Sequence, residues 1–178
     1  MIQILCILAI VLCMSIAIVK LQEKADGFVR KRAITLIFVI YAIGNLYCTM
    51  FSREFGSGVT VDLRPFQTYF HLFEVTSEGG GKTHGTLALF MSGTLPIVSL
   101  ILNILLYYPL GYLLPILFPK LKPKHVILIG CLCSIATEAT QYLLKMGWCE
   151  TDDVIHNTLG TAIGVWVWIW QAKRHGKQ

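Results

Sequence analysis

The stretch PIVSLILNILLYYPLGYLLPILF, residues 96–118, contains no charged side chain and is long enough to cross a lipid bilayer as one helix. Four other apolar stretches approach or reach the ~20 residues that such a crossing requires. These stretches predict an all-α integral membrane protein in which about five transmembrane helices form one bundle. The predicted spans are residues 2–19, 33–51, 96–118, 126–144 and 153–170.

The composition argues against the main alternative, a soluble domain. The chain has 178 residues, of which 55% are hydrophobic and only 14% are charged. A soluble domain carries roughly 25% charged residues, because its surface must be hydrated. We therefore attribute the formal net charge of +5 to the loops of a membrane protein and not to a surface that binds nucleic acid. The lipid bilayer is the partner that this composition implies, and the oligomeric state stays open.

The basic residues indicate how the spans are oriented. They concentrate in residues 20–32, 119–125 and 171–178, which successive spans place on the same side of the membrane. Because cytoplasmic loops carry the excess of Lys and Arg, the N terminus is expected outside and the C terminus inside. The chain is then a single membrane domain, residues 1–178, with a basic cytoplasmic tail at 171–178.

The one long loop, residues 52–95, is expected on the extracytoplasmic side. It contains four aromatic residues at helical spacing, which form one stripe on a helix. Two interpretations remain: an amphipathic segment in the outer headgroup region, or rings that cover the ends of the bundle. Residues 86–95 are expected to form a short interfacial or re-entrant segment, and a disulfide between Cys48 and Cys149 stays open. The stripe consists of Phe66, Tyr69, Phe70 and Phe73.

Several spans contain polar side chains at matching depths. Asn103 and Glu138 each lie roughly 10 Å from the outer end of their spans, and Asn157 lies about 6 Å in. Polar and charged side chains are costly at bilayer depth, so they normally face protein or a water-filled cavity. We therefore expect these residues to line a cleft that opens to the outside.

Helical phase supports this expectation. Asp153, Asn157, Gly160 and Gly164 share one face, on which the two glycines permit close approach of a second helix. Asp152 or Asp153 can also cap that helix, whose N terminus favours negative charge. Two further polar stripes are expected: one of Glu138, Gln141, Tyr142 and Lys145, and one of Asn103, Tyr107 and Gly111.

Three blocks of the chain resemble the VanZ-like family of bacterial membrane proteins. They are VDLRPF (61–66), NILLYYPLGYLLPIL (103–117) and EATQYLLKMGWCETDDVIHNTLGTAIG (138–164). The resemblance implies a multi-pass protein of the bacterial cytoplasmic membrane. It also implies a role in lowered sensitivity to lipid-bearing glycopeptide antibiotics of the teicoplanin type.

We weigh two principal functions. In the first, the outer cleft binds a lipid-linked envelope precursor or a lipoglycopeptide without catalysing a reaction. The expected ligand-binding residues are Arg64, Asn103, Glu138, Gln141, Asp152, Asp153 and Asn157.

In the second, the protein is an intramembrane hydrolase or transferase acting on a lipid-linked substrate. Glu138 would then be the general base, assisted by His156. Either Asn157 or Asn103 would stabilise an oxyanion. A metal variant would use Asp152 and His156 with Glu138. The sequence contains none of the established catalytic or metal-binding motifs, so no metal or cofactor is expected and a non-enzymatic role is favoured. A small transporter is a weaker third hypothesis, because no inverted repeat is visible.

Overall fold

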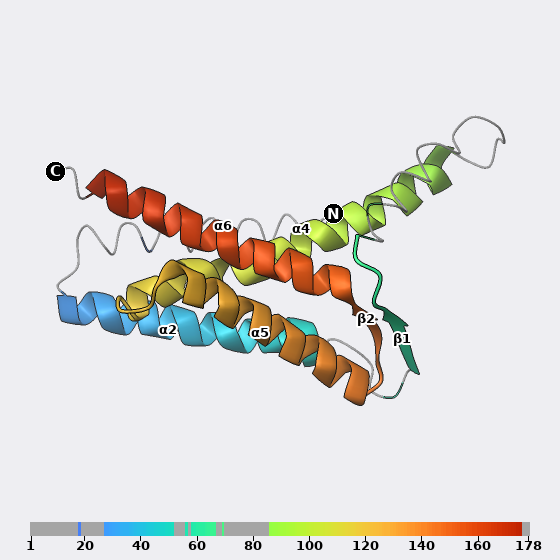
Figure 1. The fold of residues 1–178 in the computed structure, drawn as a ribbon, viewed down its shortest axis with the longest axis horizontal. Helices are drawn as coiled ribbons and strands as arrows, with labels where there is room; N and C mark the ends of the chain where they lie inside the picture. The colour runs from blue at the N-terminus through green and yellow to red at the C-terminus, as the bar shows by residue number, and fades with distance from the viewer. Residues whose placement is uncertain are drawn as a thin grey trace.

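The described part of the chain is a helical bundle with a short sheet at one end (Figure 1). The computed structural model describes residue 18 and residues 27–51, 56, 58–66, 69 and 86–175. The helices are α2 (Gly27–Leu46), α4 (Thr86–Leu117), α5 (Pro123–Leu143) and α6 (Thr151–His175). A π-helical turn, Tyr47–Phe51, extends α2, and the strands are β1 (Gly58–Asp62) and β2 (Met146–Glu150).

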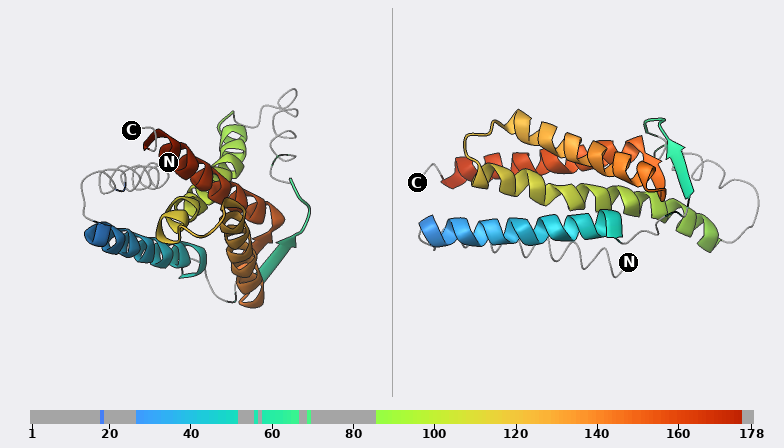
Figure 2. Two further views of the ribbon diagram at one scale, coloured as in Figure 1. Left: turned by 60° about the vertical axis from the view of Figure 1, so that its left-hand side comes forward. Right: turned by 90° about the horizontal axis from the view of Figure 1, so that it is seen from below.

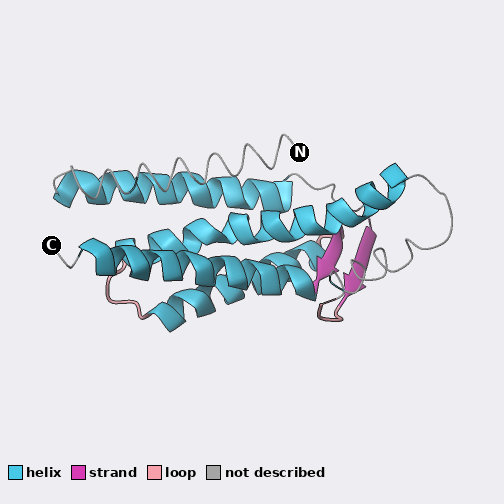
Figure 3. Ribbon diagram, turned by 90° about the horizontal axis from the view of Figure 1, so that it is seen from above, coloured by secondary structure: helices cyan, strands magenta, loops and turns pink. Residues whose placement is uncertain are grey.

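Helices that follow one another along the chain run in opposite directions, so α4 and α6, which pack together, both run from one end of the bundle to the other (Figures 1 and 2). We call the end that carries β1 and β2 the strand end (Figure 3). The opposite end, the basic end, holds the start of α2, the connection from α4 to α5 and the end of α6. Its basic residues are Arg30, Lys31, Arg32, Lys120, Lys122, Lys124, Lys173 and Arg174.

Three of the described helical segments are long and apolar enough to cross a membrane: Gly27–Met50, Ile97–Leu117 and Pro123–Leu143. On α2, large apolar side chains such as Leu36 and Ile43 are more than 60% exposed, which is costly in water and favourable in acyl chains. Three of the predicted spans thus correspond to helices that could cross a membrane by their length and composition. The predicted span 2–19 lies outside the described residues, except for Ile18.

The predicted span 153–170 forms most of α6, but it is not among the described segments apolar enough to cross a membrane. The first two turns of α6 contain Asp152, Asp153, His156 and Asn157, and these polar residues lower the mean hydropathy of the helix. Helix α6 nevertheless packs along α4 within the bundle (Figure 1). The count of five spans is therefore not established.

Helix α4 is longer than the sequence predicted. It begins at Thr86 and continues without interruption to Leu117, so the expected separate segment at 86–95 is wrong. The helix also continues through Pro109 and Pro115, both buried. Membrane helices tolerate internal proline because neighbouring helices satisfy the freed backbone groups.

Glycines bring α4 and α6 into backbone contact, as their shared face predicted. A Cβ added at Gly160 would lie 2.2 Å from the carbonyl oxygen of Ile104, and one at Gly164 would lie 2.2 Å from that of Tyr108. From the other side, a Cβ at Gly111 would overlap the backbone of Thr161. Small residues of this kind allow close packing of membrane helices.

The two strands form a parallel pair that the expected all-α fold did not include. Gly58 pairs with Met146 and Asp62 with Glu150, so residues far apart in the sequence are joined at the strand end. Because β2 directly follows α5 and precedes α6, the sheet fixes the loop after α2 against the start of α6.

Candidate functional site

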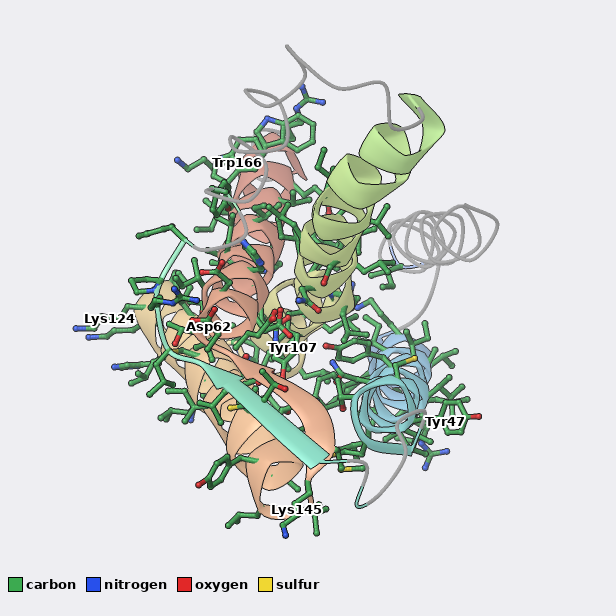
Figure 4. The ribbon with its side chains drawn as sticks, turned by 90° about the vertical axis from the view of Figure 1, so that its right-hand side faces the viewer. Tyr47, Asp62, Tyr107, Lys124, Lys145 and Trp166 are labelled. Atoms are coloured by element: carbon green, nitrogen blue, oxygen red, sulfur yellow. The ribbon has the colours of Figure 1, made fainter. Side chains whose placement is uncertain are left out.

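Polar side chains from α4, α5 and α6 meet inside the bundle toward the strand end (Figure 4). We call this group the polar seam. Most of its members are buried, and hydrogen bonds connect the helices through them. The seam consists of Asn103, Ser134, Glu138, Gln141, Asp152, Asp153, His156 and Asn157.

Helix α5 contributes one buried polar face to the seam. Ser134, Glu138 and Gln141 recur at helical spacing and are at most 6% exposed. A Glu138 carboxylate oxygen accepts a hydrogen bond from the backbone N–H of Glu150 at 3.0 Å. The Gln141 amide donates to the backbone carbonyl of Thr49 at 3.0 Å, which ties α5 to the turn after α2.

Helix α6 contributes four polar residues from its first two turns. Asp153 accepts a hydrogen bond from the Asn103 amide at 2.5 Å, and Asn157 donates to the Ser134 hydroxyl at 2.8 Å. Asp152, 3% exposed, accepts from the backbone N–H of Phe66. Both aspartates lie in the first helical turn, where the helix dipole favours negative charge.

The segment after β1 covers the strand end of the seam. Phe66 has a φ of 66° and is held through its N–H by Asp152. The Tyr69 hydroxyl lies 3.1 Å from Nε2 of His156, and the two rings meet edge to face. For Tyr69, this favours the interpretation that the aromatic stripe covers the bundle; Phe70 and Phe73 lie outside the described residues.

Arg64 lies two residues before Phe66, on this covering segment. Its guanidinium forms two hydrogen bonds with the Asp62 carboxylate, at 3.1 and 2.9 Å, and its side chain is 71% exposed. Asp62 pairs with Glu150 in the backbone register of the sheet, and the Arg64 guanidinium offsets the charge of the Asp62 member of this acidic pair.

Six of the eight side chains of the seam are buried, and hydrogen bonds join them across helices. The cleft that opens to the outside stays a prediction, whereas one of the predicted stripes differs from the structure. Tyr142 is 51% exposed and Lys145 is also exposed, so the predicted stripe that included them is wrong. Figure 4 shows Lys145 pointing away from the bundle.

Two polar atoms of the seam have no hydrogen-bond partner among the described residues. They are the side-chain carbonyl oxygens of Gln141 and Asn157, both fully buried. A buried acceptor left without a donor costs about 1–3 kcal/mol. These oxygens are therefore the places where a donor from outside the described chain would be most favourable.

Cys149 lies next to the seam on β2. Burial raises the pKa of its thiol, and the neighbouring Glu138 carboxylate raises it further because a thiolate there would face a like charge. Among the described residues, Cys48 and Cys149 occur as thiols and not as a disulfide.

The structure brings the residues of the enzymatic alternative into one region but gives them different partners. Glu138 accepts from the backbone of Glu150, whereas His156 pairs with Tyr69 and Asn157 with Ser134. In the described ranges, no three His, Cys, Asp or Glu side chains are placed to hold a metal ion, which contradicts the metal variant.

Sequence reasoning missed Ser134 and Thr49 as members or partners of the seam. Ser134 lies one turn before Glu138 and shares its face, so helical spacing could have identified it. Thr49 takes part through its backbone carbonyl, and every residue has one, so the pattern of side chains in the sequence could not have identified it.

Comparison with known proteins identifies a family. The family model described as VanZ/LLP1 matches residues 38–172, which covers most of the chain. No curated protein matches the chain, and no solved structure matches it.

Proposed function

We propose a function from the premise that the chain belongs to the VanZ/LLP1 family. In this proposal, the protein is a multi-pass protein of the bacterial cytoplasmic membrane, with the strand end facing outward. Its polar seam binds the polar part of a lipid-linked envelope precursor or of a lipoglycopeptide. Such binding lowers the sensitivity of the cell to glycopeptide antibiotics of the teicoplanin type.

The observation that carries the proposal is the pair of buried carbonyl oxygens, on Gln141 and Asn157, that lack a donor among the described residues. They belong to two different helices, and both side chains are anchored through their N–H₂ groups. Peptide and glycopeptide ligands are rich in N–H donors, which fit such preoriented acceptors. On binding, each carbonyl oxygen that is now buried without a donor would accept a hydrogen bond worth about 0.5–1.5 kcal/mol.

The orientation in the proposal follows from charge. Eight of the ten described Lys and Arg residues lie at the basic end, the exceptions being Arg64 and Lys145, and the first turn of α6 at the opposite end is acidic. The positive-inside rule therefore supports an outward strand end. A ligand from the outer leaflet would reach the seam when the segment carrying Phe66 and Tyr69 lifts from Asp152 and His156.

The test compares two variants that break the same hydrogen bond. Ser134→Ala and Asn157→Ala both remove the Ser134–Asn157 contact, but only Asn157→Ala removes the unpartnered carbonyl oxygen. Teicoplanin binding to the purified protein is measured by calorimetry, and antibiotic susceptibility is measured in cells expressing each variant. We expect Asn157→Ala to weaken binding about tenfold, corresponding to ~1.4 kcal/mol, and Ser134→Ala to stay within about twofold of the wild type.

Equal losses in both variants would refute the role of the carbonyl oxygen, because the shared structural defect would explain them. Glu138→Gln provides a second measurement, since it keeps an acceptor for the Glu150 N–H while removing the charge. If the purified protein turns over a lipid-linked precursor and Glu138→Gln abolishes that turnover, the enzymatic alternative replaces the binding function.

A further inference from the structure

Helices α2, α4 and α5 enclose a second site, a groove of about 410 Å³ to which α6 contributes no residue. In the end-on view, α2 and α5 lie on either side of the lower part of α4 (Figure 4). We call this site the lateral groove. Its walls include Phe38 and Ala42 of α2, Leu110 of α4, and Cys133 and Ala136 of α5.

The surroundings of the lateral groove determine what can occupy it. All three of its walls are helices long and apolar enough to cross a membrane. Its mouth, between α2 and α5, therefore lies at bilayer depth, where the surrounding molecules are hydrocarbon chains and not water. A hydrocarbon chain is thus the chemistry that fits the groove.

The volume of the groove favours one chain over two. A volume of about 410 Å³ lies within the range of roughly 300–1,000 Å³ that small-molecule sites occupy. A methylene group is similar in size to a water molecule, whose share of liquid volume is ~30 Å³, so the groove holds on the order of fourteen such groups. This is enough for a long segment of a single tail and too little for the two tails of a phospholipid.

The lateral groove borders the polar seam at the strand end. Thr140 and Met50 line the groove, and their chain neighbours Gln141 and Thr49 form the hydrogen bond that ties α5 to the turn after α2. A lipid whose head reached the seam could therefore place its tail in the groove without leaving the surface of α5.

Polar groups within the groove are already satisfied by the protein. The Tyr41 hydroxyl donates to the carbonyl of Leu106 at 2.9 Å, and the Asn45 amide donates to Tyr41 at 3.0 Å. The Tyr107 hydroxyl lies 3.3 Å from that of Thr137. Because these groups bond to one another, the groove can accept an apolar chain without leaving them buried and unpaired.

We propose that the lateral groove binds the single hydrocarbon tail of the lipid-linked ligand whose polar part the seam holds, an inference that rests on the proposed function. The occupant is a single-chain lipid carrier, for which a polyprenyl phosphate is the probe. A tail that enters the groove leaves hydrocarbon and not water, so what the groove adds to the polar contacts is van der Waals packing against three helices.

The experiment uses full-length protein in phosphatidylcholine nanodiscs that contain a polyprenyl phosphate with a photoreactive diazirine on its tail. After irradiation, mass spectrometry locates and quantifies the adducts. Ala136→Trp fills the groove, whereas Ala139→Trp places the same side chain on the exposed surface of the same helix, outside the groove. We expect adducts on the groove segments of α2 and α5 in the wild type, a loss of at least fivefold in Ala136→Trp, and no change in Ala139→Trp.

Three results would overturn the inference. One is equal labelling in the two tryptophan variants. Another is equally strong labelling of the groove by a phosphatidylcholine that carries the same diazirine, which would assign the groove to ordinary bilayer lipid. The third is an absence of groove adducts in the wild-type protein, which would show that the tail does not occupy the groove.

Different experimental results would refute the inference about the lateral groove and the proposed function of the seam. Groove adducts that persist while Asn157→Ala retains teicoplanin binding would leave the lateral groove standing and remove the seam from the ligand site. Absence of adducts together with a selective loss of binding in Asn157→Ala would leave the seam and remove the groove.

Discussion

Replacement of Gly160 by alanine tests the closest contact in the bundle. The added Cβ would lie 2.2 Å from the Ile104 carbonyl oxygen and 2.9 Å from two further backbone atoms of that residue. Ordinary contact begins near 3.4 Å, so α4 and α6 must separate by roughly 1 Å. Overpacking of this kind costs about 1–3 kcal/mol, and the upper end applies because backbone atoms cannot rotate away.

The helix itself gains from the same substitution. Alanine is about 1 kcal/mol more favourable than glycine within a helix, because glycine loses more backbone freedom on folding. The net expectation for Gly160→Ala is therefore a loss of about 2 kcal/mol in the free energy of unfolding. The separation would also stretch the hydrogen bond from Asn103, the residue before Ile104, to Asp153.

Gly44→Ala is the matched control. Gly44 lies within α2, and a Cβ added there meets no atom within 4 Å. Only the gain in helix propensity applies, so this variant should be stabilised by about 0.5–1 kcal/mol. Unfolding of both purified variants by sodium dodecyl sulfate in mixed micelles, followed by circular dichroism, gives the two changes. If both variants shift in the same direction by the same amount, the close contact between α4 and α6 is refuted.

Three further predictions concern the polar seam and the sheet. Asn103→Leu removes a donor to the Asp153 carboxylate and should lower the free energy of unfolding by about 1.5–3 kcal/mol in the same titration. The Glu138 carboxylate raises the pKa of the Cys149 thiol, so Glu138→Gln should shift the pH dependence of maleimide alkylation at Cys149 to lower pH. Peptide mass spectrometry measures the extent of alkylation at each pH, and an unshifted profile would contradict the prediction. Arg64→Ala should change stability by less than about 1 kcal/mol, because its ion pair is exposed, and a larger loss would indicate a buried role.

The apolar spans and the glycine face were predictable because hydropathy and helical phase are local properties of the sequence. Gly160 and Gly164 recur at a spacing that can only place them on one face of a helix, and α4 packs there. The start of α4 was not predictable in this way. Residues 86–95 contain Gly93 and Thr94 and are less apolar than residues 96–117, yet the helix continues through them.

The parts that the sequence did not predict depend on contacts between distant segments. Lys145 was placed on the stripe of Glu138 because the helix was assumed to continue, whereas α5 ends at Leu143 and Lys145 adopts a φ of 53°. The pairing of β1 with β2 joins residues 58–62 to residues 146–150. The first segment, GVTVD, alternates polar and apolar residues over only five positions, and its partner, MGWCE, does not alternate. Gly147, with a φ of 97°, is a local sign of the turn that begins β2.

The two proposed sites use different faces of α5, and this has a consequence for how a ligand would act. Glu138 and Gln141 face the seam, whereas Cys133 and Ala136 line the lateral groove. Thr137, which also lines the groove, contacts Tyr107 on α4 through its hydroxyl at 3.3 Å, so a ligand that passed straight through the bundle would have to break this hydrogen bond. A ligand that fills both sites would therefore pass around the strand end of α5, past Gln141. Its head would then have to displace Phe66 from Asp152, and Tyr69 from His156, while the close packing of α4 against α6 stays unchanged.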